Sequence, residues 1–368
     1  MTGRERIQAI FRHQPVDRLS WSALVDHHSL QALPTSRRAE TPVDFYRQIG
    51  CDIVDLSGWG LPWSYSGARL VTPGVEVRQF RDDAGNLVEE QRCPRGVLRQ
   101  RTSPAWHPIE YPIKTIDDLR LALRRWEASY YEPVDDRAAY AQVDAAIGDD
   151  GVSVLFPGPS AIPYLLETQC GVEQFYYLLD DYPDDMAALI RVISERDEQR
   201  FALLAQHPCP TAILCENTST RYISPAIYQR YNLPAQRAFV DAMHQASKTA
   251  ILHMCGHVRD LLPMIRDTGT DGIHALTPPP LGDTPWELAL DILGEKLIIL
   301  GVLTPDIFHT LPVAEVGPAL DRLITPRLAA SPFILTLFAD GIPVPLERFL
   351  AVKDWAESRY TSVGRSRE

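Results

Sequence analysis

Short apolar runs recur along the chain, and the stretches between them have the residue spacing of helices. The clearest helix follows Pro183, where Met186, Leu189, Ile190 and Ile193 form one apolar stripe. Regular alternation of strands and helices favours a parallel sheet over a β-sandwich or a helix bundle. The predicted strands are Leu19–Val25, Asp52–Leu56, Val152–Phe156, Thr211–Cys215, Ala250–Met254, Asp271–Ala275, Leu297–Val302 and Phe333–Leu337. Most are apolar throughout, as expected of strands buried on both faces, and eight of them predict an α/β fold of the (β/α)8 barrel type.

The chain of 368 residues is long enough for one barrel with insertions. It contains no sequence repeat, low-complexity tract or long linker. We therefore expect a single domain that spans residues 1–368.

Two segments do not fit the barrel repeat. The opening TGRERIQAIFRHQPVDR has Thr2 as an N-cap, Glu5 three residues later and Pro15 at its end, which predicts a helical extension that plugs or flanks the barrel. Between residues 69 and 101, VEVRQF and LVEEQR flank a turn at Asp83–Asn86, which predicts an inserted β-hairpin beside the barrel mouth.

Charge and hydropathy narrow the class of partner. The net charge is −12 and no run of Lys or Arg could follow a phosphate backbone, so we expect a small-molecule substrate or a protein partner and no nucleic acid. No stretch approaches the roughly 20 apolar residues of a membrane span, and the first residues are polar. We therefore expect a cytoplasmic protein, in which six cysteines are core residues unless they meet a metal partner.

In a parallel barrel the reactive groups lie at the carboxyl ends of the strands and in the loops that follow. Potential metal ligands and acid–base groups are concentrated at those ends in this sequence. They are Asp26, His27 and His28, Asp55, Pro157–Ser160, Glu216 and Asn217, His253–Cys255, His274, and Asp340.

The most specific of these groups is the pair His253 and Cys255 at the end of AILHMC. Residues separated by one position on a strand point to the same face, so an imidazole nitrogen and a thiolate can reach one ion. The alternative is a hydrogen-bonded core histidine beside a small buried cysteine.

The C-terminal half of the chain contains, in this order, the segments LHMCGHVRDLLPMIRDTGTDGIHAL, PPPLGDT, ILGVLTPD and FADGIPVPLERFLAVKDW. In order and approximate spacing these segments resemble the C-terminal half of the methyltransferases of the uroporphyrinogen decarboxylase superfamily. The opening RERIQAIFRHQPVDRLSW is similar to the family's N-terminal pattern. The resemblance implies a (β/α)8 barrel and zinc-dependent methyl transfer.

In the corrinoid and coenzyme M methyltransferases of this superfamily, a histidine and a cysteine in H-x-C bind zinc together with a later cysteine. His253 and Cys255 match the first two ligands, and Asp340 occupies the position of the third. A carboxylate also binds zinc, and it leaves the summed ligand charge unchanged. The alternative for Asp340 is the start of an Asp-Gly turn.

The resemblance also suggests catalytic residues. Glu216 lies in a segment that resembles the family's substrate-facing loop, where it could orient a substrate or accept its proton. Asp55 lies where the decarboxylases place an aspartate that binds pyrrole nitrogens. For both carboxylates the alternative is an ion pair that fixes a loop. His274 could be a further ligand or a proton carrier, or a hydrogen-bonding residue of the wall.

Three further residues are candidates for contact with a cofactor. Asn217 follows Glu216 in the same loop, and Pro157 and Gly158 belong to a turn that resembles the family's glycine-proline turn. The favoured role of that turn is to shape the loop.

These observations predict a zinc-dependent enzyme that transfers a methyl group between a small molecule, thiol or folate and a corrinoid held by a partner protein. The first alternative is a decarboxylase-like lyase. A tetrapyrrole with many carboxylates requires arginines, and the family's R-Q-A-G-R loop would fall near Val25 to Pro34, where the sequence is VDHHSLQALP. The second alternative is a barrel of the same superfamily without catalysis.

Overall fold

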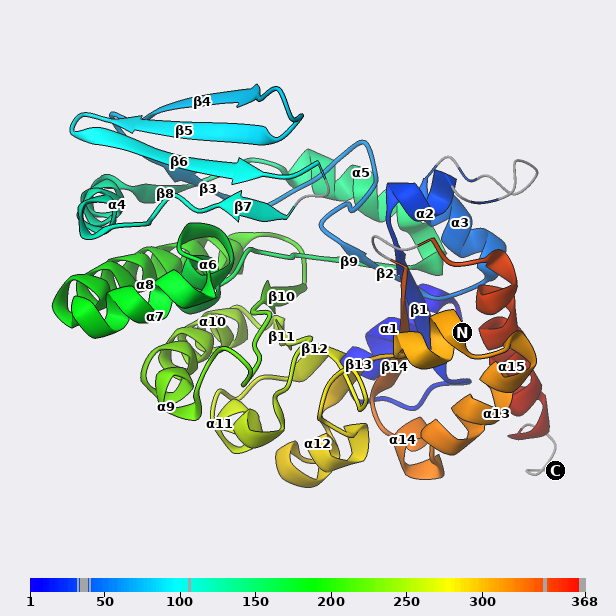
Figure 1. Ribbon diagram of the computed structural model, residues 1–368. Coiled ribbons are helices and arrows are strands. Elements are labelled where there is room, and N and C mark those ends of the chain that lie inside the picture. The colour runs from blue at the N-terminus through cyan, green and yellow to red at the C-terminus, as the bar shows by residue number, and fades with distance from the viewer. Residues whose placement is uncertain (32, 34–38, 40, 105–106, 340–342, 364–368) are drawn as a thin grey trace.

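The computed structural model of the chain describes residues 1–31, 33, 39, 41–104, 107–339 and 343–363 (Figure 1). Its largest sheet is parallel and six-stranded. In spatial order the strands are β1 (Ser20–Val25), β14 (Phe333–Ala339), β13 (Ile298–Val302), β12 (Gly272–Leu276), β11 (Thr249–His253) and β10 (Thr211–Cys215). The predicted α/β class is confirmed, with this sheet forming a parallel half-barrel.

The remaining two predicted strands, β2 (Ile53–Leu56) and β9 (Gly151–Val154), form a separate parallel pair. A single bridge between Leu155 and Ala212 joins the end of β9 to β10. On the other side, the Asp52 amide donates to the Trp21 carbonyl at 2.9 Å. The pair therefore lies between β1 and β10, and all eight predicted runs are strands within two residues of their expected bounds.

Helices cover the outside of the strands and follow one another around an arc (Figure 1). They are α3 (Pro42–Ile49), α5 (Arg137–Ile147), α6 (Ala161–Tyr164), α7 (Val172–Asp181), α8 (Pro183–Gln206), α9 (Pro225–Ile227), α10 (Leu233–Gln245), α11 (Leu262–Arg266), α12 (Trp286–Leu293), α13 (Val313–Leu323), α14 (Pro326–Ala330) and α15 (Leu346–Val363). The four predicted stripe residues of α8 are all buried, as the sequence pattern predicts.

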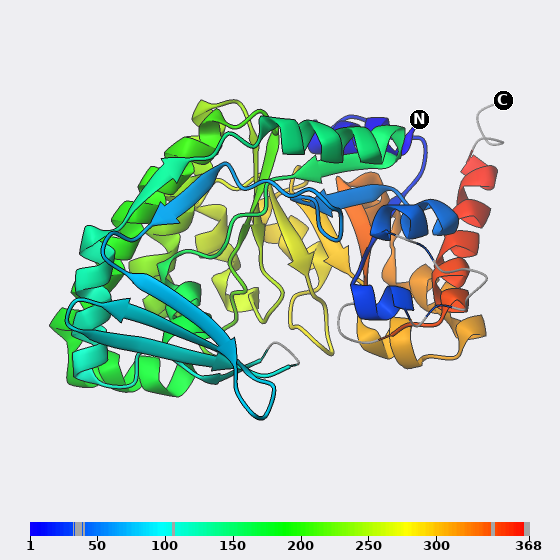
Figure 2. The same cartoon turned by 90° about the horizontal axis from the view of Figure 1, so that it is seen from above.

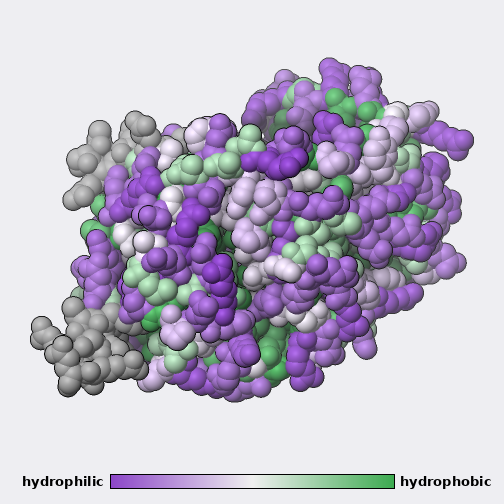
Figure 3. Space-filling view, turned by 180° about the vertical axis from the view of Figure 1, so that it is seen from behind, coloured by the Kyte–Doolittle hydropathy of each residue, from purple (hydrophilic) through white to green (hydrophobic). Residues whose placement is uncertain are grey.

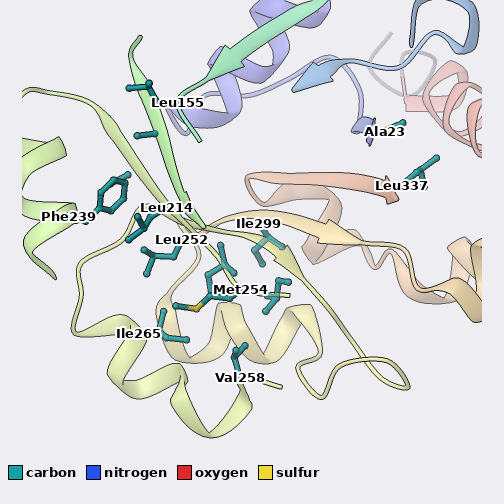
Figure 4. Packing of buried hydrophobic residues seen from close by; sticks show 14 of the residues in the cluster. Ala23, Leu155, Leu214, Phe239, Leu252, Met254, Val258, Ile265, Ile299 and Leu337 are labelled. Atoms are coloured by element: carbon teal, nitrogen blue, oxygen red, sulfur yellow. The ribbon is translucent and has the colours of Figure 1, made fainter. Parts of the chain in front are cut away.

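Each of the two faces of the strands is covered by its own apolar layer. The outer layer packs strand residues against helices, as Figure 4 shows for Leu214 and Leu252 beside Phe239 of α10 and Ile265 of α11. The inner layer fills the lumen, the space that the curved sheet encloses. Its strand residues are Val54, Leu56, Val154, Ile213, Ile251, Ile298, Leu300 and Ile334.

The first helix, α1 (Gly3–Phe11), closes the amino-terminal end of the lumen. Thr2 caps it, with the reciprocal bond from Glu5 that the sequence predicts. Ile7 and Ile10 are buried and join the inner layer, which confirms that the extension plugs the barrel. The buried Arg6 of the same helix forms an ion pair with Asp52 at the amino end of β2.

The segment between β2 and α5 is larger than the predicted hairpin. It contains a four-stranded antiparallel sheet, a two-stranded ribbon and a helix, and the sheet stands beside the parallel strands in Figure 2. The elements are β3 (Ala68–Val71), β4 (Glu76–Arg81), β5 (Leu87–Cys93), β6 (Gly96–Thr102), β7 (Pro108–Glu110), α4 (Ile116–Ala128) and β8 (Tyr130–Pro133). β4 and β5 pair across the predicted turn, but the paired elements run from Ala68 to Pro133, so the expected limits of 69 and 101 were too narrow.

In the part of the chain that the structure describes, no helix has both the length and the apolar character needed to cross a membrane. The surface seen from behind in Figure 3 is mostly hydrophilic, with small separate apolar areas.

Candidate active site

Strand alternation decides which polar side chains enter the lumen. Successive side chains of a strand point to opposite faces. Ile213 and Ile251 belong to the inner layer, so Cys215 and His253, each two residues further along, also face the lumen at the carboxyl end. Cys215 of β10 and His253 of β11 are direct neighbours in the strand register.

His253 meets His274 across the ends of β11 and β12. Their Nδ1 atoms are 2.8 Å apart, and Phe156 lies edge-on to both rings. Burial lowers the pKa of His253 to about 4, and burial together with His253 lowers the pKa of His274 well below its ordinary value. Both rings are therefore neutral near pH 7, so one Nδ1–H donates to the other Nδ1. The ring that donates keeps an unprotonated Nε2, which is the form that binds a metal.

Cys255 follows β11 and is exposed at the mouth of the lumen. Its thiol donates to Oδ1 of Asn217 at 3.5 Å. Asn217 has a left-handed backbone with φ of 39°, and its backbone N–H donates to the His253 carbonyl. The loop after β10 is thus held against β11, which keeps the predicted residues Asn217, His253 and Cys255 in one place.

Glu167, which the sequence patterns did not identify, is bonded to the same Asn217 side chain. Glu167 lies in a π-helical turn, η3 (Leu165–Gln169), and its Oε2 accepts from Asn217 Nδ2 at 3.2 Å. Burial raises the pKa of Glu167 to about 7, against the lowering effect of Asn217. Single-turn π-helices frequently occur at functional sites. One sequence signal was present, since Glu167 is the only acidic residue in AIPYLLETQC.

Glu216 lies on the other face of β10 and does not enter the lumen. It is fully buried, and its carboxylate accepts from the Ser160 amide at 2.9 Å, the Ser160 hydroxyl at 3.0 Å and Gln236 Nε2 at 2.6 Å. These bonds favour the loop-fixing alternative over a catalytic role for Glu216.

Asp55 is also turned away from the lumen, because its neighbours Val54 and Leu56 belong to the inner layer. Its carboxylate accepts from the Ser153 hydroxyl and from the Gly58 amide. Burial raises the pKa of Asp55. This arrangement fixes the turn after β2 and does not present Asp55 to a substrate in the lumen.

Hydrogen bonds from β10 and α8 fix the turn at Pro157 and Gly158. The Pro157 carbonyl accepts from the Cys215 amide, and Arg200 donates to the carbonyls of Gly158 and Pro159 at 3.0 and 3.1 Å. These contacts support the expected role of the turn in shaping the loop.

His253 and Cys255 are two donors whose chemistry suits zinc, a neutral imidazole and an accessible thiol. Asp340, the expected third ligand, lies outside the described residues, as do the side chains of His27 and His28. Among the residues that are described, no three His, Cys, Asp or Glu side chains are already arranged to hold a metal ion.

Comparisons with known proteins concern the family, the sequence relatives and the fold of this chain. A family model described as uroporphyrinogen decarboxylase (URO-D) matches residues 159–347, more than half of the chain. The methylcobamide:CoM methyltransferase MtbA of Methanosarcina acetivorans is 36% identical over 126 residues, which are 34% of this chain and only 30% of that protein. A solved methyltransferase from Methanosarcina mazei has a TM-score of 0.59 at 13% identity, with 98% of this chain and 99% of that chain covered, and it shares the fold.

Proposed function

The chain belongs to the uroporphyrinogen decarboxylase family, and from that premise we propose that it is a zinc-dependent methyltransferase. The observation that carries the proposal is a neutral His253 at the carboxyl end of β11, followed two residues later by the accessible Cys255. The methyl group passes between a small molecule, thiol or folate and a corrinoid presented by a partner protein. The partial identity with a methylcobamide:CoM methyltransferase supports this choice of reactants.

Three side chains are proposed to hold the zinc: His253 through Nε2, Cys255 as a thiolate, and Asp340 through its carboxylate. A fourth position remains for water or substrate, as in catalytic zinc sites. Zinc supplies Lewis acidity that keeps a thiol in its thiolate form near pH 7. His274 has a positioning role in this proposal, because its bond to Nδ1 of His253 fixes the tautomer of the ligand.

The two alternatives have less support. A decarboxylase must hold the carboxylates of a tetrapyrrole, and the segment from Val25 to Pro34 contains no arginine. A barrel without catalysis has no use for two neutral donor side chains at its mouth. Turnover of uroporphyrinogen by the purified protein would reverse the ranking of the first two functions.

The proposed architecture is a closed (β/α)8 barrel that forms one domain over residues 1–368. The bridge from Leu155 to Ala212 and the bond from Asp52 to Trp21 support closure on both sides of the β2–β9 pair. One cooperative unfolding transition is the expected result. Two separate transitions would contradict the single domain.

Elemental analysis of purified variants tests the zinc site. We expect about one zinc per chain in the wild type, almost none in Cys255→Ala, and substantially less than the wild type in Asp340→Asn. Asp340→Cys restores the family's ligand set and should hold zinc at least as well as the wild type. Cys93→Ala, in the antiparallel sheet, is the matched control and should keep the metal. Metal-free wild type from zinc-replete cells, or full zinc content in Asp340→Asn, would defeat the three-ligand site.

Activity is tested with methylcobalamin and coenzyme M as probes. The wild type should demethylate the cobalamin, which the visible spectrum reports, and Cys255→Ala should not. Zinc-loaded wild type that leaves methylcobalamin unchanged with every thiol and folate acceptor tried would remove the support for these reactants.

A further inference from the structure

We propose that Glu167 is the acid–base residue of this site, which accepts the proton of the thiol that takes up the methyl group. The inference rests on the proposed function and adds a residue to it. In the reverse direction Glu167 returns the proton to the heteroatom that has lost its methyl group.

The first support is position. One side chain, the Asn217 amide, holds both Glu167 and Cys255: its Nδ2 donates to the carboxylate at 3.2 Å, and its Oδ1 accepts from the thiol at 3.5 Å. The carboxylate and the thiol are therefore linked through a single amide group by two hydrogen bonds. A substrate that approaches Cys255 therefore comes within reach of Glu167.

The second support is that the Glu167 carboxylate is not saturated. Its one hydrogen bond within the described part of the chain comes from Asn217, and no ion pair there includes it. Glu216, in contrast, accepts three bonds and is fully buried. Glu167 can thus exchange a proton with a ligand, whereas Glu216 has no free approach.

The third support comes from the groups around Glu167. The charged and titratable side chains that act on it or respond to it are Glu216, the thiols of Cys215 and Cys255, and the phenol of Tyr222. In the zinc-free protein none of these is a cation at neutral pH. Burial, together with these surroundings, raises the pKa of Glu167 to about 7, where a carboxylate both accepts and releases protons efficiently.

The other candidate proton carriers are unsuited. His253 is the proposed zinc ligand, and His274 is hydrogen-bonded to Nδ1 of His253 at 2.8 Å, so both rings already have a role at the metal. Asp55 faces the outer layer. Among the acid–base side chains described at this mouth, Glu167 combines access with a suitable pKa.

The proton step balances without a redox partner. The thiol S–H bond breaks, its electron pair stays on sulfur as the thiolate, and the proton forms an O–H bond with Glu167. The thiolate electron pair then forms the S–CH3 bond as the bond between the methyl carbon and its corrinoid donor breaks and leaves its electron pair on that donor, and Glu167 later loses its proton to water.

Calorimetry in two buffers of different ionisation enthalpy measures the proton directly. The probe is coenzyme M, added to zinc-loaded protein at pH 7.5. We expect the wild type to release clearly less than one proton per thiol bound and Glu167→Gln to release about one, because the amide cannot take the proton. Glu173→Gln, at an exposed position in the first turn of α7, is the matched control and should behave as the wild type.

Kinetics with methylcobalamin give the second readout. Glu167→Gln should keep its zinc, lose about 100-fold in kcat and lose the rising limb of the pH profile near pH 7, and Glu167→Asp should recover part of the rate. Wild-type proton release and rate in a Glu167→Gln protein that retains zinc would overturn the role of Glu167 and leave the proposed function intact. A wild type that neither binds zinc nor transfers methyl groups would overturn both.

Discussion

At the end of β10, the fully buried carboxylate of Glu216 accepts hydrogen bonds from Ser160 and Gln236 on the outer face. On the lumen face, Cys215 and His253 are neighbours in the strand register, and Cys255, two residues beyond the end of β11, is exposed. Cys215 on the lumen face and Glu216 on the outer face are adjacent in the sequence. The polar groups of the two faces differ in how many hydrogen bonds they already make within the protein.

The difference separates two tasks. Buried polar groups that are fully bonded stabilise one arrangement of a loop, and the bonds to Glu216 and Arg200 do this for the turn at Pro157–Ser160. Groups with free bonding capacity at a mouth are available to a ligand, at some loss of stability. Substitutions on the outer face should therefore affect folding, and those on the lumen face should affect binding.

The largest expected effect is on the outer face. Glu216→Ala leaves the donors of Ser160 and Gln236 without a partner in a buried space, so it should lower the free energy of unfolding by about 3 kcal/mol. Urea denaturation measures this, and zinc per folded chain should stay unchanged. The lumen counterpart, Cys255→Ala, should change the stability of the zinc-free protein by less than about 1 kcal/mol. Equal losses of unfolding free energy in the two variants would contradict the different tasks assigned to the two faces.

The next effect is a gain in stability on the lumen face. The pKa of Glu167 is raised from 4.5 to about 7, so the folded state binds more protons than the unfolded state between those values, and stability falls as pH rises through 7. Glutamine has no charge to bury. Glu167→Gln should therefore unfold like the wild type at pH 4 and be more stable by about 2 kcal/mol at pH 8, after allowance for partial exposure. Urea denaturation at both pH values is the test, and a constant difference would contradict burial of the charge.

Sequence patterns identify the strands well because each is a short run of residues buried on both faces. They locate His253 on the lumen face because alternation along β11 is regular, whereas Cys255 follows the end of that strand. They do not separate the two roles weighed for Asp55 and Glu216, since a polar residue at a strand end has the same appearance whether it faces the lumen or the helices. They fail for Glu167 because a π-helical turn has no recognised sequence period and the partner, Asn217, is 50 residues away.

A smaller effect is expected from the second histidine. His274→Phe keeps an aromatic ring beside Phe156 but removes the bond to Nδ1 of His253, so the ligand loses its fixed tautomer. Zinc affinity should fall by about 10-fold, as for other residues that orient a metal ligand. Competition with a chromophoric chelator measures the affinity. His244→Phe, an exposed histidine paired with Asp271, is the control. Equal affinity in both variants would reduce His274 to a residue of the wall.

The smallest effect is predicted for Asp55→Asn, on the outer face of β2. In the wild type the Gly58 amide and the Ser153 hydroxyl both donate to Oδ2 of Asp55, so an asparagine oxygen at that position can still accept both bonds. Because the wild-type carboxylate is buried and its pKa is raised, losing the charge removes little stabilisation, and the free energy of unfolding should change by less than about 1 kcal/mol. Zinc content and the rate of methyl transfer should equal those of the wild type. A 10-fold loss of kcat/KM in a protein that unfolds normally would place Asp55 in contact with the substrate, and strand alternation would then not be sufficient to separate the two faces.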